Sequence, residues 1–150
     1  MIEKHRFMRP RDTQVHAAAG EFEQKMEFSE LVPAAASTFD GSVAKAIIQS
    51  GHALPFKRYQ VQVLPLTQIY HRTIFPELVD LLTVDVEGSG LSVLKGIDFT
   101  LLRPRMIVLE MNDDSRDAPM REFLRSHGYE AIRTFGCNEV FVGGEQHQDS

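Results

Sequence analysis

The chain has 150 residues, of which 43% are hydrophobic and 25% are charged. This is the composition of an ordinary globular domain, and it excludes a disordered or fibrous protein. Sixteen Lys and Arg residues stand against 21 Asp and Glu, and the net charge of -5 disfavours a nucleic-acid partner bound through its phosphates. The N-terminal residues are polar and no apolar run approaches the length of a membrane span, so we expect no membrane partner.

Cys137 is the single cysteine, so no intrachain disulfide can form. We therefore expect a reducing, cytoplasmic location. We expect Cys137 itself to be a small buried residue rather than a reactive thiol. The length is that of one ordinary domain, and we expect residues 1–150 to form a single domain.

The first half of the sequence predicts extended segments around a loose region. TQVHAAAG, residues 13–20, predicts a short strand that ends at a glycine turn, and residues 25–28 predict a second extended segment. Residues 31–56 are rich in Ala, Ser, Gly and Pro, and we expect a flexible loop that contains a short helix capped by Ser42. RYQVQVLPL, residues 58–66, alternates polar and apolar side chains, which predicts a strand with one solvent-exposed face.

The second half predicts four further strands. Apolar runs at residues 81–84 and 105–112 predict buried strands, and we expect helices on both faces of the first. Residues 129–135 and 138–144, separated by Gly136, predict an antiparallel pair. We expect the tail, residues 145–150, to be frayed.

Helices are predicted between these strands. Residues 91–95 predict a short helix with Ser89 as its cap. A longer helix is predicted from Asp117, its cap, through Pro119 in the first turn to a terminating Gly128. The order strand, helix, strand, helix, strand, strand indicates an α/β fold.

Acidic and amide side chains follow both predicted buried strands. They are Asp85 and Glu87 after the first strand, and Glu110, Asn112, Asp113 and Asp114 at the end of the second. In an open α/β sheet, ligands bind outside the carboxyl ends of the strands. Strands that follow one another along the chain are commonly neighbours, so we expect these side chains on one rim. Gly88 and Gly90 would let backbone approach a ligand closely.

Two interpretations of these acids stay open. A carboxylate directly after so apolar a strand risks a desolvation cost of a few kcal/mol unless something binds it, which favours a functional role for Asp85 and Glu87. Alternatively, acids in loops before helices cap or oppose the positive helix end, and residues 113–117 then form a solvated loop.

Other kinds of site find no support in the sequence. The six histidines show no pair at a metal-ligand spacing and no cysteine cluster accompanies them, so we expect no metal site. No GxSxG, P-loop or HExxH sequence is present, which removes the main supports for a hydrolase, an NTPase or a metalloprotease.

One segment, VDLLTVDVEGSGLSVLKGIDFTLLRPRMIVLE at residues 79–110, has a distinctive order of features. An apolar strand leads to Asp-x-Glu-Gly, a helix ends in Leu-Lys-Gly, and Arg-Pro leads into a strand that ends in Glu. This order resembles the signature of the FkbM-type methyltransferases, which use S-adenosylmethionine to methylate hydroxyl oxygens of sugars and other small metabolites. The matching residues are Asp85, Glu87, Gly88, Leu94, Lys95, Gly96, Arg103, Pro104 and Glu110. One departure is Gly90, where the family often has an acid.

The resemblance implies a Rossmann-like methyltransferase sheet. It implies catalytic-site roles for three acids: Asp85 would orient or deprotonate the acceptor hydroxyl, and Glu87 and Glu110 would hold the acceptor. Residues 13–20 match the third strand of that fold, which implies that Ala19 and Gly20 lie near the adenine of the cofactor. The first two strand-helix units, with the glycine-rich cofactor loop, are not found. We therefore expect a partial, mostly parallel sheet with an antiparallel C-terminal pair, and an isolated chain that is inactive.

Two functional hypotheses result. The first is an S-adenosylmethionine-dependent O-methyltransferase, incomplete as given, with a hydroxyl group of a sugar or another small metabolite as its acceptor. The alternative is a non-catalytic remnant or binding module. In both, the strand at residues 81–84 would present an exposed apolar edge, which favours pairing with a second copy or another chain.

Overall fold

A computed structural model describes residues 7–73, 78–86, 88–112 and 114–144, without the side chain of Asp114. The chain divides into two compact units, Met1–Ala18 with Phe22–Leu64, and Ala19–Glu21 with Pro65–Ser150. The expectation of a single domain stays a prediction. The tail predicted to be frayed, residues 145–150, lies outside the described residues. Within the described ranges, no helix is both long enough and apolar enough to cross a membrane.

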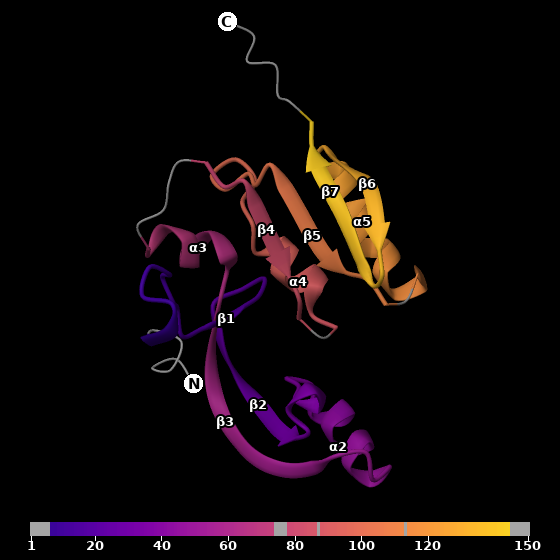
Figure 1. The fold of residues 1–150 in the computed structure, drawn as a ribbon. Coiled ribbons are helices and arrows are strands. Elements are labelled where there is room, and N and C mark those ends of the chain that lie inside the picture. Colours follow the sequence, from indigo (N-terminus) through magenta and orange to yellow (C-terminus); the bar gives the residue numbers. More distant parts are fainter. Residues whose placement is uncertain (1–6, 74–77, 87, 113, 145–150) are drawn as a thin grey trace, which may run out of the picture. The chain divides into compact units, whose positions relative to one another are not determined.

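The first unit is built around a long antiparallel strand pair (Figure 1). β2 (Gln24–Val32) pairs with β3 (Leu54–Leu64), and the last residue of β2 lies opposite the first of β3. β1 (Ala18–Ala19) lies on the other side of β3 in the same sheet. The first predicted strand is therefore shorter than expected, and the two that follow begin earlier in the sequence than predicted.

The region predicted as a loop, residues 31–56, is largely regular in structure. It holds the end of β2, the short 3-10 helix η1 (Ala34–Ala36), α2 (Gly41–Gln49) and the start of β3. The predicted helix is confirmed, but its cap is Asp40 rather than Ser42.

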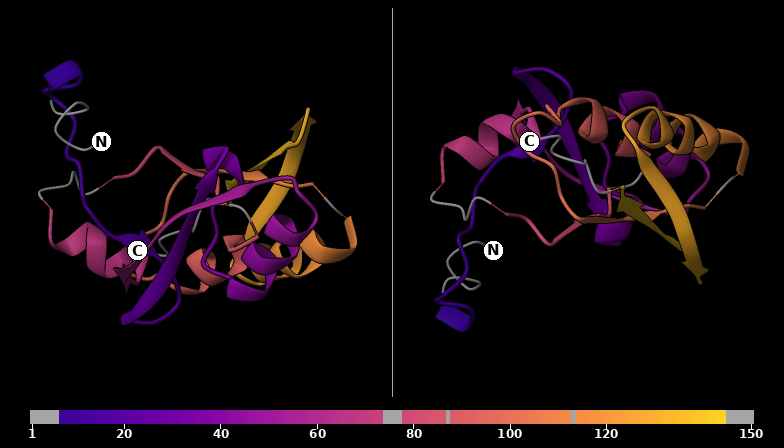
Figure 2. Two further views of the ribbon diagram at one scale, coloured as in Figure 1. Left: turned by 90° about the horizontal axis from the view of Figure 1, so that it is seen from below. Right: turned by 90° about the horizontal axis from the view of Figure 1, so that it is seen from above.

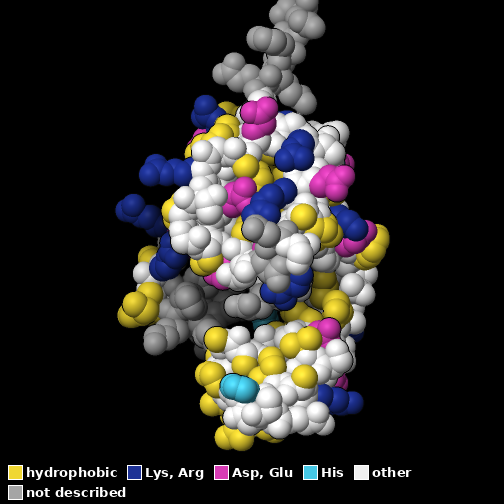
Figure 3. Space-filling model, turned by 90° about the vertical axis from the view of Figure 1, so that its right-hand side faces the viewer, with side chains coloured by type: hydrophobic (Ala, Val, Ile, Leu, Met, Phe, Trp, Pro, Cys, Tyr) yellow, Lys and Arg dark blue, Asp and Glu magenta, His cyan; other side chains and the backbone are white. Residues whose placement is uncertain are grey.

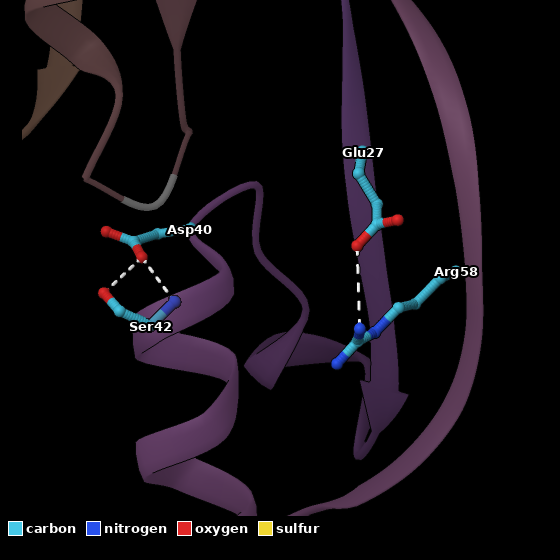
Figure 4. Close-up of polar contacts among 4 residues, drawn as sticks. All are labelled: Glu27, Asp40, Ser42 and Arg58. Carbon is cyan, nitrogen blue, oxygen red and sulfur yellow. Dashed lines mark hydrogen bonds and ion pairs between the residues drawn. The ribbon is translucent and has the colours of Figure 1, made fainter.

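The cap of α2 follows from the geometry of a helix N-terminus, where a side-chain oxygen must reach free backbone N–H groups. One carboxylate oxygen of Asp40 accepts hydrogen bonds from the N–H groups of Ser42 at 2.8 Å and Val43 at 3.1 Å. The Ser42 hydroxyl donates to the same carboxylate (Figure 4). This hydroxyl and the two N–H groups lower the pKa of Asp40 below its ordinary value. On the neighbouring strands, Arg58 and Glu27 form an exposed ion pair at 3.7 Å.

The hydrophobic cluster of this unit is small. It consists of Leu31, Ala44 and Ala53, with three partly buried residues packed against them. Val63 and Leu64, at the end of β3, are also buried. Larger apolar side chains stay at the surface, including Leu54 at 70% and Phe56 at 68% exposure. Figure 3 shows hydrophobic side chains gathered on this unit, whereas charges of both signs are interspersed over the second unit.

The second unit contains a four-stranded mixed sheet. Its strands are β4 (Leu81–Val84), β5 (Met106–Glu110), β6 (Tyr129–Phe135) and β7 (Asn138–Gly143), in the order β4-β5-β7-β6. β4 and β5 are parallel, whereas β7 is antiparallel to both β5 and β6. The predicted α/β class and the antiparallel C-terminal pair are confirmed, but the prediction of a mostly parallel sheet is wrong. The reason is that the β6–β7 hairpin supplies half of this sheet, and the separate sheet of the first unit rests on an antiparallel pair.

The described residues of this unit form the helices α3 (Leu66–His71), α4 (Gly90–Lys95) and α5 (Asp114–Ser126). Both views of Figure 2 show α4 and α5 on one face of the four-stranded sheet. The core lies between these helices and that face, and its fully buried members include Leu94, Ile107, Leu109 and Leu124. Among the described residues, the expected helices on both faces of β4 are not found: Leu81 is 52% exposed and Thr83 is also exposed, so neither packs under a helix.

Two local predictions in this unit are also corrected. α5 begins at Asp114, three residues before the predicted cap Asp117, so Pro119 lies inside the helix rather than in its first turn. Cys137 is exposed rather than buried, because it lies with Gly136 in the two-residue turn that joins β6 to β7. Gly136 has a φ of 59°, a left-handed conformation that suits glycine in such a turn.

Candidate functional site

The carboxyl ends of β4 and β5 lie side by side. Val84 is the register partner of Leu109, so Asp85 and Glu110 each follow one member of this pair. The prediction that the two strands are neighbours is therefore confirmed. The sheet brings both residues to one end of the sheet, formed by the carboxyl ends of the parallel strands, where α/β folds commonly bind ligands.

A pocket of about 180 Å³ lies at the carboxyl ends of β4 and β5. Apolar side chains form much of its wall, and the buried ones among them are Val84, Leu109 and Met120. The polar residues that line it are Glu110, Asn112, Arg116 and Asp117. The pocket therefore combines an apolar wall with carboxylate, amide and guanidinium groups, the mixture that small-molecule sites use for packing and orientation.

The wall formed by α4 depends on two glycines. Gly88 has a φ of 72°, a left-handed conformation that lets the chain turn sharply between β4 and α4. A Cβ atom at position 90 would lie 2.6 Å from the Sδ atom of Met120, so the absence of a side chain lets α5 pack closely against the start of α4. Both glycines line the pocket.

The predicted acids occupy different positions at this end of the sheet. Glu110 is half-buried and lines the pocket. Asp85 is exposed and is not among the lining residues, whereas its neighbours Val84 and Val86 are. Because the Asp85 side chain is exposed to solvent, the desolvation argument for its function does not apply. Glu87 and Asp113 lie outside the described residues.

Ala19 and Gly20, the residues expected near an adenine, belong to the second unit. Ala19 is half-buried and packs against the main core, and Gly20 is buried. The next residue, Glu21, donates its backbone N–H to the Ser92 hydroxyl of α4 at 3.1 Å. These residues therefore lie against α4, the helix whose first residues line the pocket.

Arg116, Asp117 and Met120 were not predicted as site residues, although they line the pocket. The 3.6-residue periodicity of a helix could have indicated that positions 116, 117 and 120 share one face, but only with the correct start of α5. The sequence also gave no sign that Glu139 is buried at 7% exposure. Its carboxylate accepts a 2.6 Å bond from Arg121, an ion pair that ties α5 to β7.

No cluster of three or more His, Cys, Asp or Glu residues that could hold a metal ion occurs in the part of the chain that the structure describes.

The second unit thus has a mixed apolar and polar pocket at the carboxyl ends of two parallel strands, the place where α/β proteins commonly bind small molecules. Residues 2–131 match the family described as "Methyltransferase FkbM domain". This match spans most of the chain, and the chain belongs to the FkbM methyltransferase family, which confirms the resemblance of residues 79–110. No curated protein and no solved structure gives a significant match.

The family implies S-adenosylmethionine as a cofactor, and the volume of the pocket shows whether this molecule fits there. A cavity of about 180 Å³ is smaller than the roughly 300–1,000 Å³ of typical small-molecule sites. The pocket alone therefore does not accommodate this cofactor.

Proposed function

We propose that this chain supplies the acceptor side of an S-adenosylmethionine-dependent O-methyltransferase that acts on a hydroxyl group of a sugar or another small metabolite. The observation that carries the proposal is the pocket beside Glu110, at the parallel strand ends of a chain that belongs to the FkbM methyltransferase family. S-adenosylmethionine is the methyl donor that the family implies.

The side chains around the pocket suit the binding of a hydroxyl group. A carboxylate accepts a hydrogen bond from a hydroxyl, which orients the oxygen and raises its nucleophilicity. Of the acids that were predicted from the sequence and that the structure describes, Glu110 lines the pocket. Asp117 supplies a second carboxylate there. In this proposal Glu110 orients the acceptor hydroxyl or takes its proton. This is the role that the family resemblance assigns to Asp85, which does not line the pocket, whereas Glu87 keeps the acceptor-holding role that the resemblance implies.

The apolar wall has a separate role in this proposal. Val84, Leu109 and Met120 would contact the apolar face of a sugar ring, which carries its C–H groups, and would keep water away from the reacting oxygen. A positioned general base contributes about 10²- to 10⁴-fold in rate. Binding and orientation of both reactants removes roughly 7–11 kcal/mol of the barrier. The pocket would therefore act mainly by holding the acceptor in place.

A nuclear magnetic resonance titration tests this proposal on the full chain. The probes are methyl glucoside and methyl mannoside, added to isotope-labelled protein while the backbone amide signals are followed. We expect saturable shifts at Gly88, Gly90 and Asn112. We expect these shifts to be lost in Glu110→Gln and retained in Glu130→Gln, a matched change at an exposed carboxylate of β6.

The result that would contradict the proposal is a wild-type protein whose pocket amides do not respond to either glycoside at high concentration. If Glu110→Gln and Glu130→Gln weaken glycoside binding equally, only the role of Glu110 is contradicted, because the effect would then come from overall charge.

A second candidate function is a non-catalytic binding module that associates through the edge of β4 with a second copy or another chain. The supporting observation is that β4 is an edge strand in the described four-stranded sheet, with Leu81 52% exposed. An uncovered edge presents unpaired backbone groups that another strand can pair with.

Two measurements separate the candidates. Calorimetric titration with methyl glucoside gives saturable heat if the pocket holds an acceptor, and none for a binding module that lacks an acceptor site. Analytical ultracentrifugation of Leu81→Lys shows weaker self-association if the β4 edge pairs with a second copy. The control is Leu101→Lys, which changes a 58% exposed leucine outside any strand.

A further inference from the structure

The position of α4 determines one wall of the pocket. Gly90 and Leu91, the first residues of this helix, line the pocket. α4 has only six residues, and helices shorter than about 12 residues are not stable in isolation. Val93 and Leu94 anchor its second half in the core, and contacts of Ser92 and of the turn after α4 complete its placement.

Gly96, directly after α4, is held against two distant segments of the chain. A Cβ atom at this position would lie well inside 3.0 Å of the carbonyl oxygen of Gly20, and 3.2 Å from the backbone nitrogen of Leu66. Both neighbours are backbone atoms, which cannot rotate away as a side chain could. Only glycine permits this three-way approach without displacement of the backbone.

Hydrogen bonds reinforce the same junction. The Glu21 N–H donates to the Ser92 hydroxyl at 3.1 Å, across 71 residues of sequence. The Thr67 N–H donates to the carbonyl oxygen of Gly96 at 3.2 Å, and the Thr67 hydroxyl accepts from the N–H of Asp98 at 2.7 Å. Each bond joins α4, or the turn after it, to a segment far away in the sequence.

The ion pair between Lys95 and Glu21 adds little to this junction. Its nitrogen and oxygen lie 3.9 Å apart, and both side chains are more than one-third exposed. Exposed pairs of this kind contribute little to stability. The buried glycine contact and the hydrogen bonds therefore carry the arrangement.

We propose that Ser92 and Gly96 are positioning residues that lock residues 19–21 and the first turn of α3 onto the end of α4. Through this helix, about 9 Å long at 1.5 Å per residue, they fix the pocket wall formed by Gly90 and Leu91. The importance of this wall for an acceptor rests on the proposed function. The lock itself is a property of the described contacts.

Hydrogen exchange and amide chemical shifts of the full chain test the lock. In Ser92→Ala, exchange of the Glu21 amide should quicken roughly twofold to tenfold, the effect of one lost hydrogen bond. Ser92→Thr retains a hydroxyl and should restore slow exchange. In Gly96→Ala, the amide signals of Gly90 and Leu91 should shift. The matched control is Gly41→Ala at the start of α2, where a Cβ would meet nothing within 4 Å.

The outcomes separate the lock from the proposed function. Wild-type exchange of the Glu21 amide in Ser92→Ala would overturn the lock, as would unmoved Gly90 and Leu91 signals in folded Gly96→Ala. If Gly96→Ala does not fold, the comparison of Glu21 amide exchange in Ser92→Ala and Ser92→Thr still tests the lock. The same variants titrated with methyl glucoside should bind more weakly than wild type. A wild-type protein that binds no glycoside contradicts the proposed function, whereas the hydrogen-exchange results still test the positioning role of Ser92 and Gly96.

Discussion

Removal of one hydroxyl group, in Tyr129→Phe, should measurably destabilise the second unit. The Tyr129 hydroxyl donates a 2.6 Å hydrogen bond to the carbonyl oxygen of Pro104. Tyr129 is 1% exposed, and Pro104 is among the fully buried residues. The bond therefore lies where water cannot replace it. The substitution leaves the ring in place, with its contacts to Phe99 and to the Arg103 guanidinium.

The expected loss follows from the carbonyl group left without a donor. An unsatisfied buried polar group costs about 1–3 kcal/mol, more than the net value of an ordinary hydrogen bond. For a chain of about 150 residues, each kcal/mol lowers the melting temperature by roughly 2–4 °C. We therefore expect a fall of roughly 2–12 °C in thermal unfolding followed by circular dichroism. Tyr59→Phe, at a 37% exposed residue of β3, should change the free energy of unfolding by less than about 0.5 kcal/mol.

The pH dependence of the same variant gives a second check. Burial raises the pKa of Tyr129 above its ordinary value of 10.0, and the nearby Arg103 only partly opposes this shift. The folded state thus holds the proton when the unfolded state has lost it. The resulting stability is complete below about pH 10 and is lost as the pH rises towards the folded-state pKa. Tyr129→Phe should lack this loss, and identical melting temperatures for the Tyr129 and Tyr59 variants at all pH values would refute the reasoning.

Two further substitutions test the core and the cap of α2. Leu94→Ala should cost about 2–5 kcal/mol in chemical denaturation, because Leu94 is 0% exposed in the core, whereas Leu101→Ala at 58% exposure should cost far less. Asp40→Ala should shorten or loosen α2, seen as faster amide exchange at Ser42 and Val43, since their N–H groups lose their acceptor. Because the pKa of Asp40 is lowered in the folded state, the wild-type cap should weaken as the pH falls through 3.8 and below, and Asp40→Ala should not show this dependence.

The order of elements in the second unit could be predicted because its signals are local. Apolar runs, glycine turns and capping residues lie within a few positions of the segments that they delimit. The same holds for the family, whose signature is contiguous in residues 79–110 and is confirmed by the match over residues 2–131. The neighbouring strand ends of Asp85 and Glu110 followed from the tendency of sequential parallel strands to pair.

Membership of the pocket could not be predicted in the same way. Asp85 and Glu110 occupy equivalent positions at the ends of paired strands, yet only Glu110 lines the pocket. Arg116 and Asp117 line it because α5 begins earlier than its capping signals indicated. The direction of a side chain at the end of a strand depends on the contacts of its neighbours, which no short stretch of sequence contains.

The sequence by itself therefore determined the family, the α/β class, the order of strands and helices in the second unit, and the acids at the strand ends. The tertiary structure alone decided the mixed sheet, the burial of Glu139 beside Arg121, and the junction of Gly20, Leu66 and Gly96. The physical reason is distance along the chain. Hydrophobic period and capping act between residues a few positions apart, whereas strand pairing, buried ion pairs and close backbone contacts join residues that only the folded chain brings together.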